Sequence, residues 1–475
     1  MIQRSSVAEL VEYLRSEVNR YSPGEKLPGS REWVERYRVS PVTVSRAVAR
    51  LVAEGLVTTR PGAGAYRAEP RDPAGGPAAL GDTSWQEVAL SSGVTPDASG
   101  LLAAVAGRPA GVTELNSGYL HSSLQPERAL AAALARAGRR PGAWARPPLE
   151  GLPDLRAWFA REIGGPLTAD DVLITAGGQS ALSTVVRALA PPGAPVLVES
   201  PTYPGLLAIV RGADRRPLPV PVDAGGLRVE LLDRAFRATG ARLLVCQPLF
   251  HNPTGAVLAA DRRPEVLRIA RAAGAFVVED DYARHLGHSD GPALPPTLAA
   301  EDPDGVVVHL RSLTKPASPN LRVAALAARG AVRERLRATQ VVDSFFVSRP
   351  LQEAALDLVA SPAWARHLRT VGEELRLRRR ALADAVARHL PELALTAEPR
   401  GGYHLWLRVE TGADGDAEAA FTARALRAGV AVAPGRPYFC ADPPGPHVRL
   451  GFAAAPRIED LTEAPARIGA SRPTD

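Results

Sequence analysis

Apolar residues recur with two different periods in the larger, C-terminal part of this sequence. From about residue 111 onward, short apolar runs rich in β-branched residues alternate with longer Ala/Leu/Arg-rich stretches such as Ser180–Leu189 and Asp261–Ala273. The stretches predict helices, and the runs predict buried strands. The predicted strands are Val172–Thr175, Pro195–Glu199, Leu243–Gln247, Ala275–Glu279 and Val306–Leu310. This alternation indicates an α/β fold with a doubly wound, mostly parallel sheet.

The last hundred residues mix helical stretches with the strand-like runs 401–410 and 447–453. They predict a smaller C-terminal α+β lobe. A doubly wound sheet binds its ligands at the carboxyl ends of its strands. We therefore expect the functional residues to follow the predicted strands directly.

The first 67 residues predict a compact helical unit closed by a hairpin. Ser40 is suited to cap a helix that starts at Pro41. The hairpin is predicted from strand-like residues 56–59 and 65–67, joined by a turn at 61–64. An inward apolar stripe on the capped helix is formed by Val44, Ala47, Val48 and Leu51.

The opposite face of that helix is polar and basic, with Thr43, Arg46 and Arg50. Arg60 and Arg67 flank the hairpin. These side chains suit base edges and phosphates in a DNA major groove. The periodicity is equally compatible with a three-helix bundle that has a solvated basic face.

Residues 69–110 are rich in Ala, Gly and Pro and predict a linker. The expected organisation is therefore a helical domain over residues 1–68, a linker over 69–110 and a large domain over 111–475. A chain of 475 residues exceeds what a single core usually serves, which agrees with this division.

Composition excludes several classes of protein. No apolar stretch approaches ~18 residues, so we expect no transmembrane helix and no membrane partner. The N-terminus lacks the pattern of a signal peptide, so a cytoplasmic location is expected. The two cysteines, Cys246 and Cys440, match neither a disulfide framework nor a metal site.

Charge adds two observations. The net charge of the chain is +6, and residues 1–67 contain eleven basic and seven acidic residues. This local excess of positive charge suits a polyanionic partner, or it reflects unpaired arginines on the surface. Only two of the 57 basic residues are lysines, Lys26 and Lys315. Because arginine cannot form a Schiff base, Lys315 is a candidate for amine chemistry.

The segment around Lys315, SLTKPASPNLR, offers further groups of the same kind. Arg322, seven residues later, has a planar fork suited to a phosphate, and Ser312 adds a hydroxyl. A turn with an exposed lysine is the competing interpretation. The turn at Gly177–Gly178 leads from a strand into a helix, so Gly178 and Gln179 are candidate phosphate contacts at a helix N-terminus.

Three other motifs follow predicted strands. In VVEDDY, Asp280 is suited to pair with a pyridinium nitrogen, Asp281 less so, and Tyr282 is suited to bond a ring oxygen. In QPLFHNPTG, the amide of Asn252 is suited to the same oxygen. In ESPTYPG, the ring of Tyr203 is suited to stack on an aromatic cofactor. Each motif alone is also compatible with an ordinary turn, loop or core residue.

Two resemblances unite these motifs. Residues 22–68, with GEKLP, SPVTVSRA, LVAEGL and RPGAG, closely resemble the winged helix-turn-helix of GntR-type regulators. Residues 110–465 resemble the fold-type-I aminotransferases, which bind pyridoxal phosphate. The whole chain thus resembles the MocR/GabR-type regulators.

The aminotransferase resemblance assigns roles by position. Lys315 carries the cofactor as the internal aldimine, Arg322 holds its phosphate and Asp280 pairs with its ring nitrogen. Tyr203 stacks on the ring, and the ring oxygen is bonded by Asn252 and Tyr282. Arg449, in HVRLGFA, matches the arginine that binds a substrate carboxylate.

The sequence also departs from the family. No tyrosine stands near Trp144 or Arg146, where the family commonly has one that reaches the neighbouring subunit's phosphate. The run ARHLGHS after Tyr282 lacks an acidic and aromatic pattern common in the subfamily. Gly118 and Tyr119 resemble a substrate-side loop only loosely.

The resemblance implies a homodimeric regulator that binds promoter DNA and senses an amine, an amino acid or the cofactor at Lys315. A working amino-acid aminotransferase with an accessory DNA-binding domain is the second hypothesis. A DNA-binding protein with an empty large domain is the third.

Overall fold

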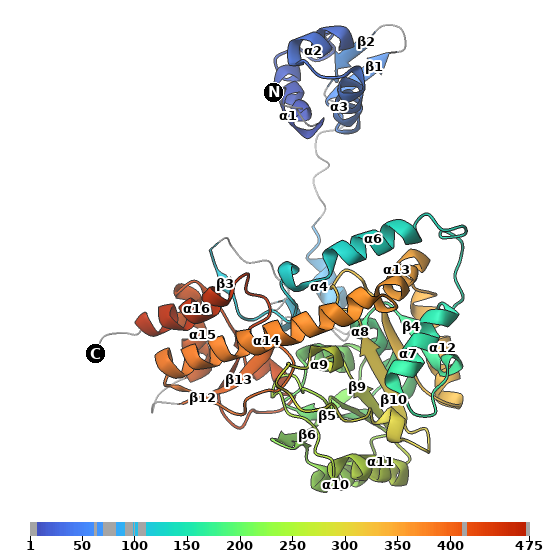
Figure 1. The fold of residues 1–475 in the computed structure, drawn as a ribbon, viewed down its shortest axis with the longest axis vertical. Helices are drawn as coiled ribbons and strands as arrows, with labels where there is room; N and C mark the ends of the chain where they lie inside the picture. The colour runs from blue at the N-terminus through green and yellow to red at the C-terminus, as the bar shows by residue number, and fades with distance from the viewer. Residues whose placement is uncertain are drawn as a thin grey trace. The chain divides into compact units, whose positions relative to one another are not determined.

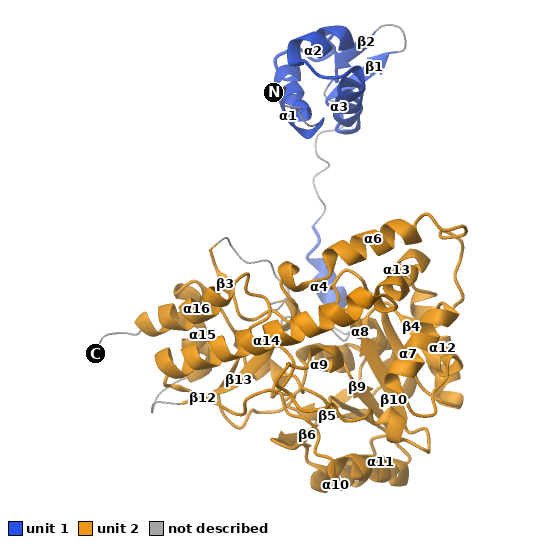
Figure 2. Cartoon of the chain, viewed as in Figure 1, with its two compact units in different colours: residues 1–92 blue, residues 93–475 orange. Residues whose placement is uncertain are grey.

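The computed structural model describes residues 7–60, 64–69, 82–90, 98, 100–102, 111–410 and 416–471. Most of the predicted linker, residues 69–110, therefore lies outside the described residues. The chain divides into two units, residues 1–92 and residues 93–475 (Figure 2).

Unit 1 contains a three-helix arrangement with a two-stranded hairpin (Figure 1). Its elements are α1 (Val7–Val18), α2 (Ser30–Tyr37), α3 (Pro41–Ala53), β1 (Val57–Arg60), β2 (Gly64–Arg67) and the short helix α4 (Trp85–Leu90). The strands β1 and β2 pair in antiparallel fashion. The core is formed by side chains that include Leu14, Trp33, Val44, Ala47 and Leu51. This is the predicted winged helix-turn-helix, and the turn of its hairpin at 61–63 lies outside the described residues.

The predicted helix start at Ser40 is confirmed. The Ser40 hydroxyl accepts a hydrogen bond from the backbone N–H of Thr43 at 3.1 Å, and Pro41 occupies the first helical turn. Val44, Ala47 and Leu51 are buried on the inner face, and Val48 is partly buried.

Unit 2 is built on an eight-stranded sheet in the order β4-β11-β10-β9-β8-β5-β6-β7. The strands are β4 (Val172–Thr175), β5 (Pro195–Ser200), β6 (Arg216–Asp223), β7 (Gly226–Leu227), β8 (Leu243–Cys246), β9 (Phe276–Asp280), β10 (Val307–Ser312) and β11 (Ala324–Ala327). The pairs from β10 through β9, β8 and β5 to β6 are parallel. The strand β11 is antiparallel to both of its neighbours. The predicted mostly parallel sheet is confirmed, and the ends of its five predicted strands differ from the prediction by at most two residues. The strands β6, β7 and β11 were not predicted.

Helices cover both faces of this sheet (Figure 1), and a separate apolar core lies on each face. They are α6 (Glu127–Ala137), α7 (Pro153–Ile163), α8 (Gly178–Leu189), α9 (Pro204–Gly212), α10 (Val229–Thr239), α11 (Arg262–Ala273), α12 (Ala331–Ser344) and α13 (Arg349–Val359). The 28-residue helix α14 (Pro362–His389) then leads from the sheet to the C-terminal lobe.

The C-terminal lobe has its own antiparallel sheet, in the order β12-β13-β16-β15. Its elements are β12 (Leu393–Leu395), β13 (His404–Val409), α15 (Ala417–Arg427), β14 (Val430–Ala431), β15 (Ala433–Pro434), β16 (His447–Gly451) and α16 (Ile458–Ala470). The short strand β3 (Thr113–Glu114) pairs with β14. The segment that follows the predicted linker is therefore built into this lobe.

The helix cap at Ser40 gives a first prediction. Replacing Ser40 with Ala removes the side-chain acceptor for the Thr43 N–H, so unit 1 is expected to lose about 1 kcal/mol of unfolding free energy. Denaturant unfolding of the full chain, followed by far-UV circular dichroism, measures this loss. Ser40→Asp restores an acceptor and is the control. Equal destabilisation by both substitutions would contradict the assignment of the cap.

Candidate functional site

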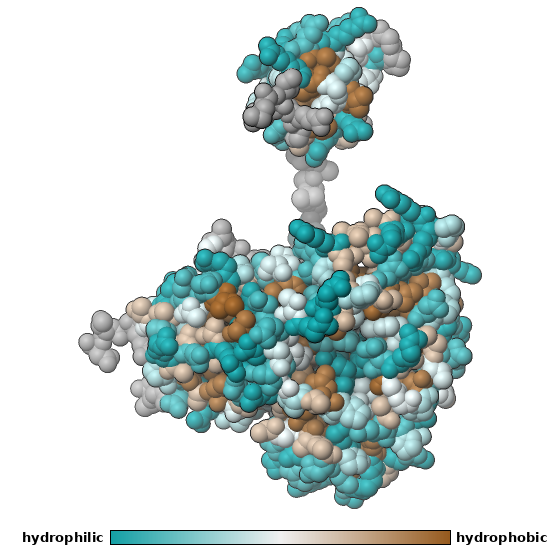
Figure 3. Space-filling model, viewed as in Figure 1, coloured by the Kyte–Doolittle hydropathy of each residue, from teal (hydrophilic) through white to brown (hydrophobic). Residues whose placement is uncertain are grey.

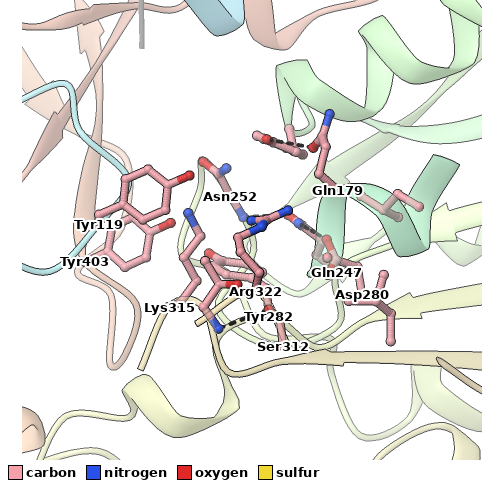
Figure 4. A pocket seen from close by; sticks show the side chains of 15 residues that line it. Tyr119, Gln179, Gln247, Asn252, Asp280, Tyr282, Ser312, Lys315, Arg322 and Tyr403 are labelled. Carbon is pink, nitrogen blue, oxygen red and sulfur yellow. Dashed lines mark hydrogen bonds between the residues drawn. The ribbon is translucent and has the colours of Figure 1, made fainter. Parts of the chain in front are cut away.

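The carboxyl ends of the parallel strands and the turns after them form one cavity of about 90 Å³. Gln247 follows β8, Asp280 ends β9 and Ser312 ends β10. Gly178 begins α8 after β4, and Tyr203 follows β5. The structure brings together here all the cofactor residues predicted from the sequence: Gly178, Gln179, Tyr203, Asn252, Asp280, Tyr282, Ser312, Lys315 and Arg322 (Figure 4).

One end of the cavity is suited to an anion. The N-terminus of α8 presents backbone N–H groups that have no partner within the helix. The Arg322 guanidinium lies beside them and donates to the carbonyl of Ala176 at 2.7 Å. A Cβ atom added at residue 177 would lie 2.7 Å from that guanidinium. The φ angle of +89° at this residue also favours glycine. Glycine at residue 177 therefore allows the backbone and the Arg322 guanidinium to lie close together.

The amine of Lys315 lies on the other side of the cavity. It donates a hydrogen bond to the carbonyl of Gly118 at 2.7 Å and lies 3.9 Å from the ring centroid of Tyr119. Figure 4 shows the rings of Tyr119 and Tyr403 side by side next to this amine. Desolvation, and then the positive charge of Arg449, lower the pKa of Lys315 to about 7. A large share of the amine is thus unprotonated and nucleophilic at neutral pH.

Asp280 is a buried carboxyl group at the base of the cavity. Burial raises its pKa to about 7, while a hydrogen bond from Gln247 opposes this rise. The Gln247 side chain donates to Asp280 Oδ2 at 2.7 Å and accepts from the backbone N–H of Asn252 at 3.0 Å. Gln247 therefore fixes the positions of two residues of the site at once.

The neighbouring Asp281 faces a different environment. Its Oδ2 accepts hydrogen bonds from Arg311 and Arg284, both at 2.6 Å. Arg311 and Asp281 are each 1% exposed, and the nearby guanidinium groups hold the pKa of Asp281 well below its usual range. Asp281 thus has a structural ion pair and does not line the cavity, whereas Asp280 does.

The three other predicted ring contacts also line the cavity. The Tyr203 hydroxyl donates to Gln179 Oε1 at 3.1 Å, which orients the ring. The Tyr282 hydroxyl donates to the carbonyl of Phe250 at 2.7 Å, so its proton is already used within the protein. Asn252 accepts from Arg449 through Oδ1 and keeps its amide N–H groups for a ring oxygen.

Arg449 lines a second cavity of about 120 Å³ that shares Tyr119, Tyr203, Lys315 and other residues with the first. It is 4% exposed and donates to Asn252 Oδ1 at 3.1 Å and to the carbonyl of Asn116 at 2.7 Å. The guanidinium is therefore held next to the amine of the site. Gly118 and Tyr119, loosely suggested by the sequence, line this second cavity too.

Sequence reasoning did not identify Gln247, Thr314 and Tyr403 as site residues. Gln247 and Thr314 stand one and two residues beyond a strand, where a polar side chain also suits a turn. Tyr403 comes from the C-terminal lobe, in the segment RGGYH, and its place here depends on how the two parts of unit 2 pack. Because ligands of such sheets bind at the carboxyl ends of the strands, the positions of Gln247 and Thr314 just after strands could have identified both as site residues.

The residues predicted to contact DNA lie on unit 1 as follows. Thr43, Arg46 and Arg50 are on α3, where both arginines are exposed. Arg50 Nε lies 3.7 Å from a carboxylate oxygen of Glu54. Arg60 stacks over the ring of Tyr66 at 4.6 Å. The α3 face is thus open to a partner.

Arg67 differs from the other four candidates for DNA contact. Its guanidinium donates to the backbone carbonyls of Asn19 and Tyr21, so it ties the hairpin to the end of α1. A phosphate contact by Arg67 would have to share the guanidinium with these bonds.

The departures from the family pattern can also be located. The side chain of Trp144 is 84% exposed, and Arg146 is exposed as well. His285, in the run after Tyr282, is partly buried, and desolvation of its ring lowers its pKa to about 3. Within the described ranges, no group of His, Cys, Asp and Glu is arranged to hold a metal ion, and no helix has the length and apolar character needed to cross a membrane.

These residues fit pyridoxal phosphate. An anion site, a buried carboxyl group and an amine with a lowered pKa surround one cavity. The Thr314 hydroxyl adds an orphaned donor, because it is buried and has no hydrogen-bond partner among the described residues. When bound, the cofactor supplies an aldehyde for the amine and a ring that withdraws electrons. Arg322, Ser312 and the start of α8 would hold its phosphate, and Asp280 would keep its ring nitrogen protonated.

The pKa of Lys315 predicts how pH controls cofactor loading. Protonated Lys315 is not a nucleophile, so the rate at which cofactor-free protein combines with pyridoxal phosphate should rise with pH through about 7 and level off above it. Stopped-flow growth of the visible absorbance band measures this rate. Arg449→Gln removes a charge that lowers the pKa, so its profile should lie at higher pH with the same cofactor. A wild-type midpoint near 10.5, the ordinary pKa of lysine, would contradict the assignment.

Known proteins share both parts of this structure. The family described as aminotransferase class I and II matches residues 111–468, and the bacterial regulatory proteins of the gntR family match residues 7–66. The 2-aminoadipate transaminase of Thermus thermophilus is 32% identical over 364 residues, which are 76% of this chain and 89% of that protein. The HTH-type transcriptional regulator YdfD of Bacillus subtilis is 24% identical in an alignment of 480 positions that covers 97% of this chain and 95% of that protein.

A solved structure agrees with the larger match. The α-aminoadipate aminotransferase LysN from Thermus thermophilus, in complex with N-(5'-phosphopyridoxyl)-L-leucine, is 29% identical and superposes with a TM-score of 0.72. The superposition covers 82% of this chain and 98% of that one. Pyridoxal phosphate is accordingly the cofactor of this fold, and the cavity around Lys315 is its candidate site. The chain belongs to the aminotransferase class I and II family, and it carries an N-terminal GntR-type DNA-binding domain fused to that fold.

Proposed function

We propose that this protein is a cytoplasmic, homodimeric transcription regulator that binds promoter DNA through α3 and senses an amine or amino acid at Lys315. The observation that carries the proposal is a cavity lined by Lys315, Asp280 and Arg322, groups that suit pyridoxal phosphate, in a chain that also has a GntR-type domain. An incoming amine would replace the Lys315 amine on the cofactor, and Arg449 would hold a carboxylate of the incoming molecule.

The hydrogen bonds of Lys315 and Arg449 suggest how the site reports its state. Lys315 donates to the carbonyl of Gly118, and Arg449 donates to the carbonyl of Asn116. Both acceptors lie in the segment that directly follows the region predicted as the linker. A ligand that draws either side chain away would break its hydrogen bond to a carbonyl of this segment. The free energy of holding the segment in place would then differ between the ligand-free and the ligand-bound protein.

The DNA-binding part rests on the exposed residues of α3. Arg46 and Arg50 are exposed on the face opposite the buried stripe, where a recognition helix presents side chains to base edges and phosphates. Thr43 is partly exposed, and its hydroxyl also lies 2.8 Å from that of Ser40. Arg60, exposed at the end of β1, would add a phosphate contact.

The homodimer is supported by apolar side chains that one copy leaves exposed. Trp144, Val342 and Phe345 are 84%, 81% and 64% exposed. A Cβ on Gly142 would lie 3.9 Å from the Arg349 guanidinium, so the loop that carries Trp144 lies next to the start of α13, four residues after Phe345. Hydrophobic residues are also visible beside α6 and α13 in Figure 3. Large exposed apolar groups of this kind typically mark a contact surface.

An active aminotransferase is the second candidate function. It is favoured by the 32% identity to a transaminase and by the complete set of Lys315, Asp280 and Arg449. The two candidates differ in turnover. A regulator responds to stoichiometric binding, whereas an aminotransferase converts many equivalents of amino acid and keto acid.

Lys315 provides the test of the proposal. Protein loaded with pyridoxal phosphate should show a visible band that shifts with an amino acid, and Lys315→Ala should abolish the lysine-dependent band. Lys315→Arg should fail as well, because a guanidinium cannot bond the aldehyde. The matched control is Lys26→Arg, which changes the only other lysine and should keep the band.

Two results would count against the proposal. A band and an amino-acid response that both survive in Lys315→Ala would remove Lys315 from the sensing site. Turnover of many equivalents well above that of free pyridoxal phosphate would favour the aminotransferase.

A further inference from the structure

The second cavity has an uneven distribution of charge. Among the described residues that line it, the charged ones are Lys315 and Arg449. No acidic side chain and no further cation lines this cavity among the described residues. Arg211 and Arg436 line the adjoining cavity beyond Leu101 and Pro437, where they donate to the carbonyl of Cys440 and to Asp442. The remaining wall is mostly apolar or aromatic and includes Leu101, Tyr119, Pro204, Tyr403, Val432, Ala433, Pro434, Pro437 and Tyr438.

In the proposed function, Lys315 marks the position of the ligand's amino group and Arg449 binds its carboxylate. These two residues therefore determine the positions of two of the three groups on the α-carbon of an amino acid. The amino group must lie where Lys315 contacts the cofactor, and the carboxylate must lie against Arg449. The guanidinium of Arg449 is suited to this because its Nε is buried without a partner in the described structure. The third group, the side chain, then faces the apolar part of the wall.

Two glycines influence the space available to that side chain. A Cβ on Gly118 would lie 3.4 Å from the Lys315 amine and from the Tyr403 hydroxyl. A Cβ on Gly100 would lie 3.4 Å from Pro437 and 3.7 Å from Pro204, so residues 100–102 pack against the wall at these prolines. Glycine at 118 keeps the cavity open beside the amine, and Leu101 adds an apolar side chain at its edge.

We infer that the molecule sensed at this site is an α-amino acid with an uncharged, apolar side chain of branched or aromatic type. This inference rests on the proposed function and specifies its ligand. A second carboxylate or a distal ammonium group would be desolvated against the apolar wall without a charged partner, which is unfavourable. A branched or aromatic side chain would bury apolar surface against the same wall.

Affinities measured on the loaded full-length protein test the inference. The probes are L-leucine, L-phenylalanine, L-2-aminoadipate and L-lysine, each titrated while the cofactor absorbance is followed. L-leucine or L-phenylalanine should bind at least about 10-fold more tightly than either charged amino acid, a factor that corresponds to about 1.4 kcal/mol. Tighter binding of L-2-aminoadipate or L-lysine would overturn the inference.

A substitution on the wall gives a second, independent readout. Leu101→Arg adds a cation at the edge of the cavity and should raise the affinity for L-2-aminoadipate relative to L-leucine by about 10-fold. The matched control is Leu102→Arg, since Leu102 is 62% exposed and does not line this cavity. An equal effect of both variants, or no effect of Leu101→Arg, would contradict the placement of the ligand side chain.

The outcomes separate this inference from the proposed function. If charged amino acids shift the cofactor band best, the sensing site stands and the ligand class is wrong. The ligand class is also wrong if γ-aminobutyrate binds more tightly than all four probes, because its carboxylate is not attached to the carbon that carries the amine. If the band forms but responds to no amino compound, the proposed function itself fails, and the inference fails with it.

Discussion

Desolvation of the Lys315 amine is the constraint on which the chemistry of this protein depends. The surrounding side chains and the positive charge of Arg449 lower the pKa of Lys315 to about 7, so the amine can act as a nucleophile near neutral pH. The same burial raises the pKa of Asp280 to about 7. Asp280 would pair with the cationic ring nitrogen of bound pyridoxal phosphate, and Lys315 would supply the amine that its aldehyde requires.

The sheet brings these groups together and keeps them in place. Five parallel strands end at one edge, and Gln247 and Asp280 are joined there by a hydrogen bond of 2.7 Å. Next to Asp280, Asp281 forms a buried ion pair with Arg311, which anchors the end of β9 to β10. The C-terminal lobe adds Arg449 and Tyr403, so the ligand cavity requires both parts of unit 2.

Much of this arrangement could be predicted from the sequence, for physical reasons that also explain the gaps. The scarcity of lysine singled out Lys315, and the apolar runs located four of the five parallel strands, β5, β8, β9 and β10, to within two residues. The fifth, β6, was missed because three prolines interrupt its apolar run. Gln247 and Thr314 were missed because a polar residue after a strand also suits a turn. The internal bonds of Arg67 were missed because periodicity does not show where a long side chain folds back.

The central claim is that occupancy of the Lys315 site changes the affinity of unit 1 for DNA. Fluorescence anisotropy of the loaded full-length protein with DNA from upstream of its own gene, with and without saturating L-phenylalanine, tests it most directly. The account predicts a change in dissociation constant of about 5-fold or more, absent in Lys315→Ala, and weak binding by Arg46→Ala under both conditions. An unchanged affinity for DNA, while the cofactor band shifts, would contradict it.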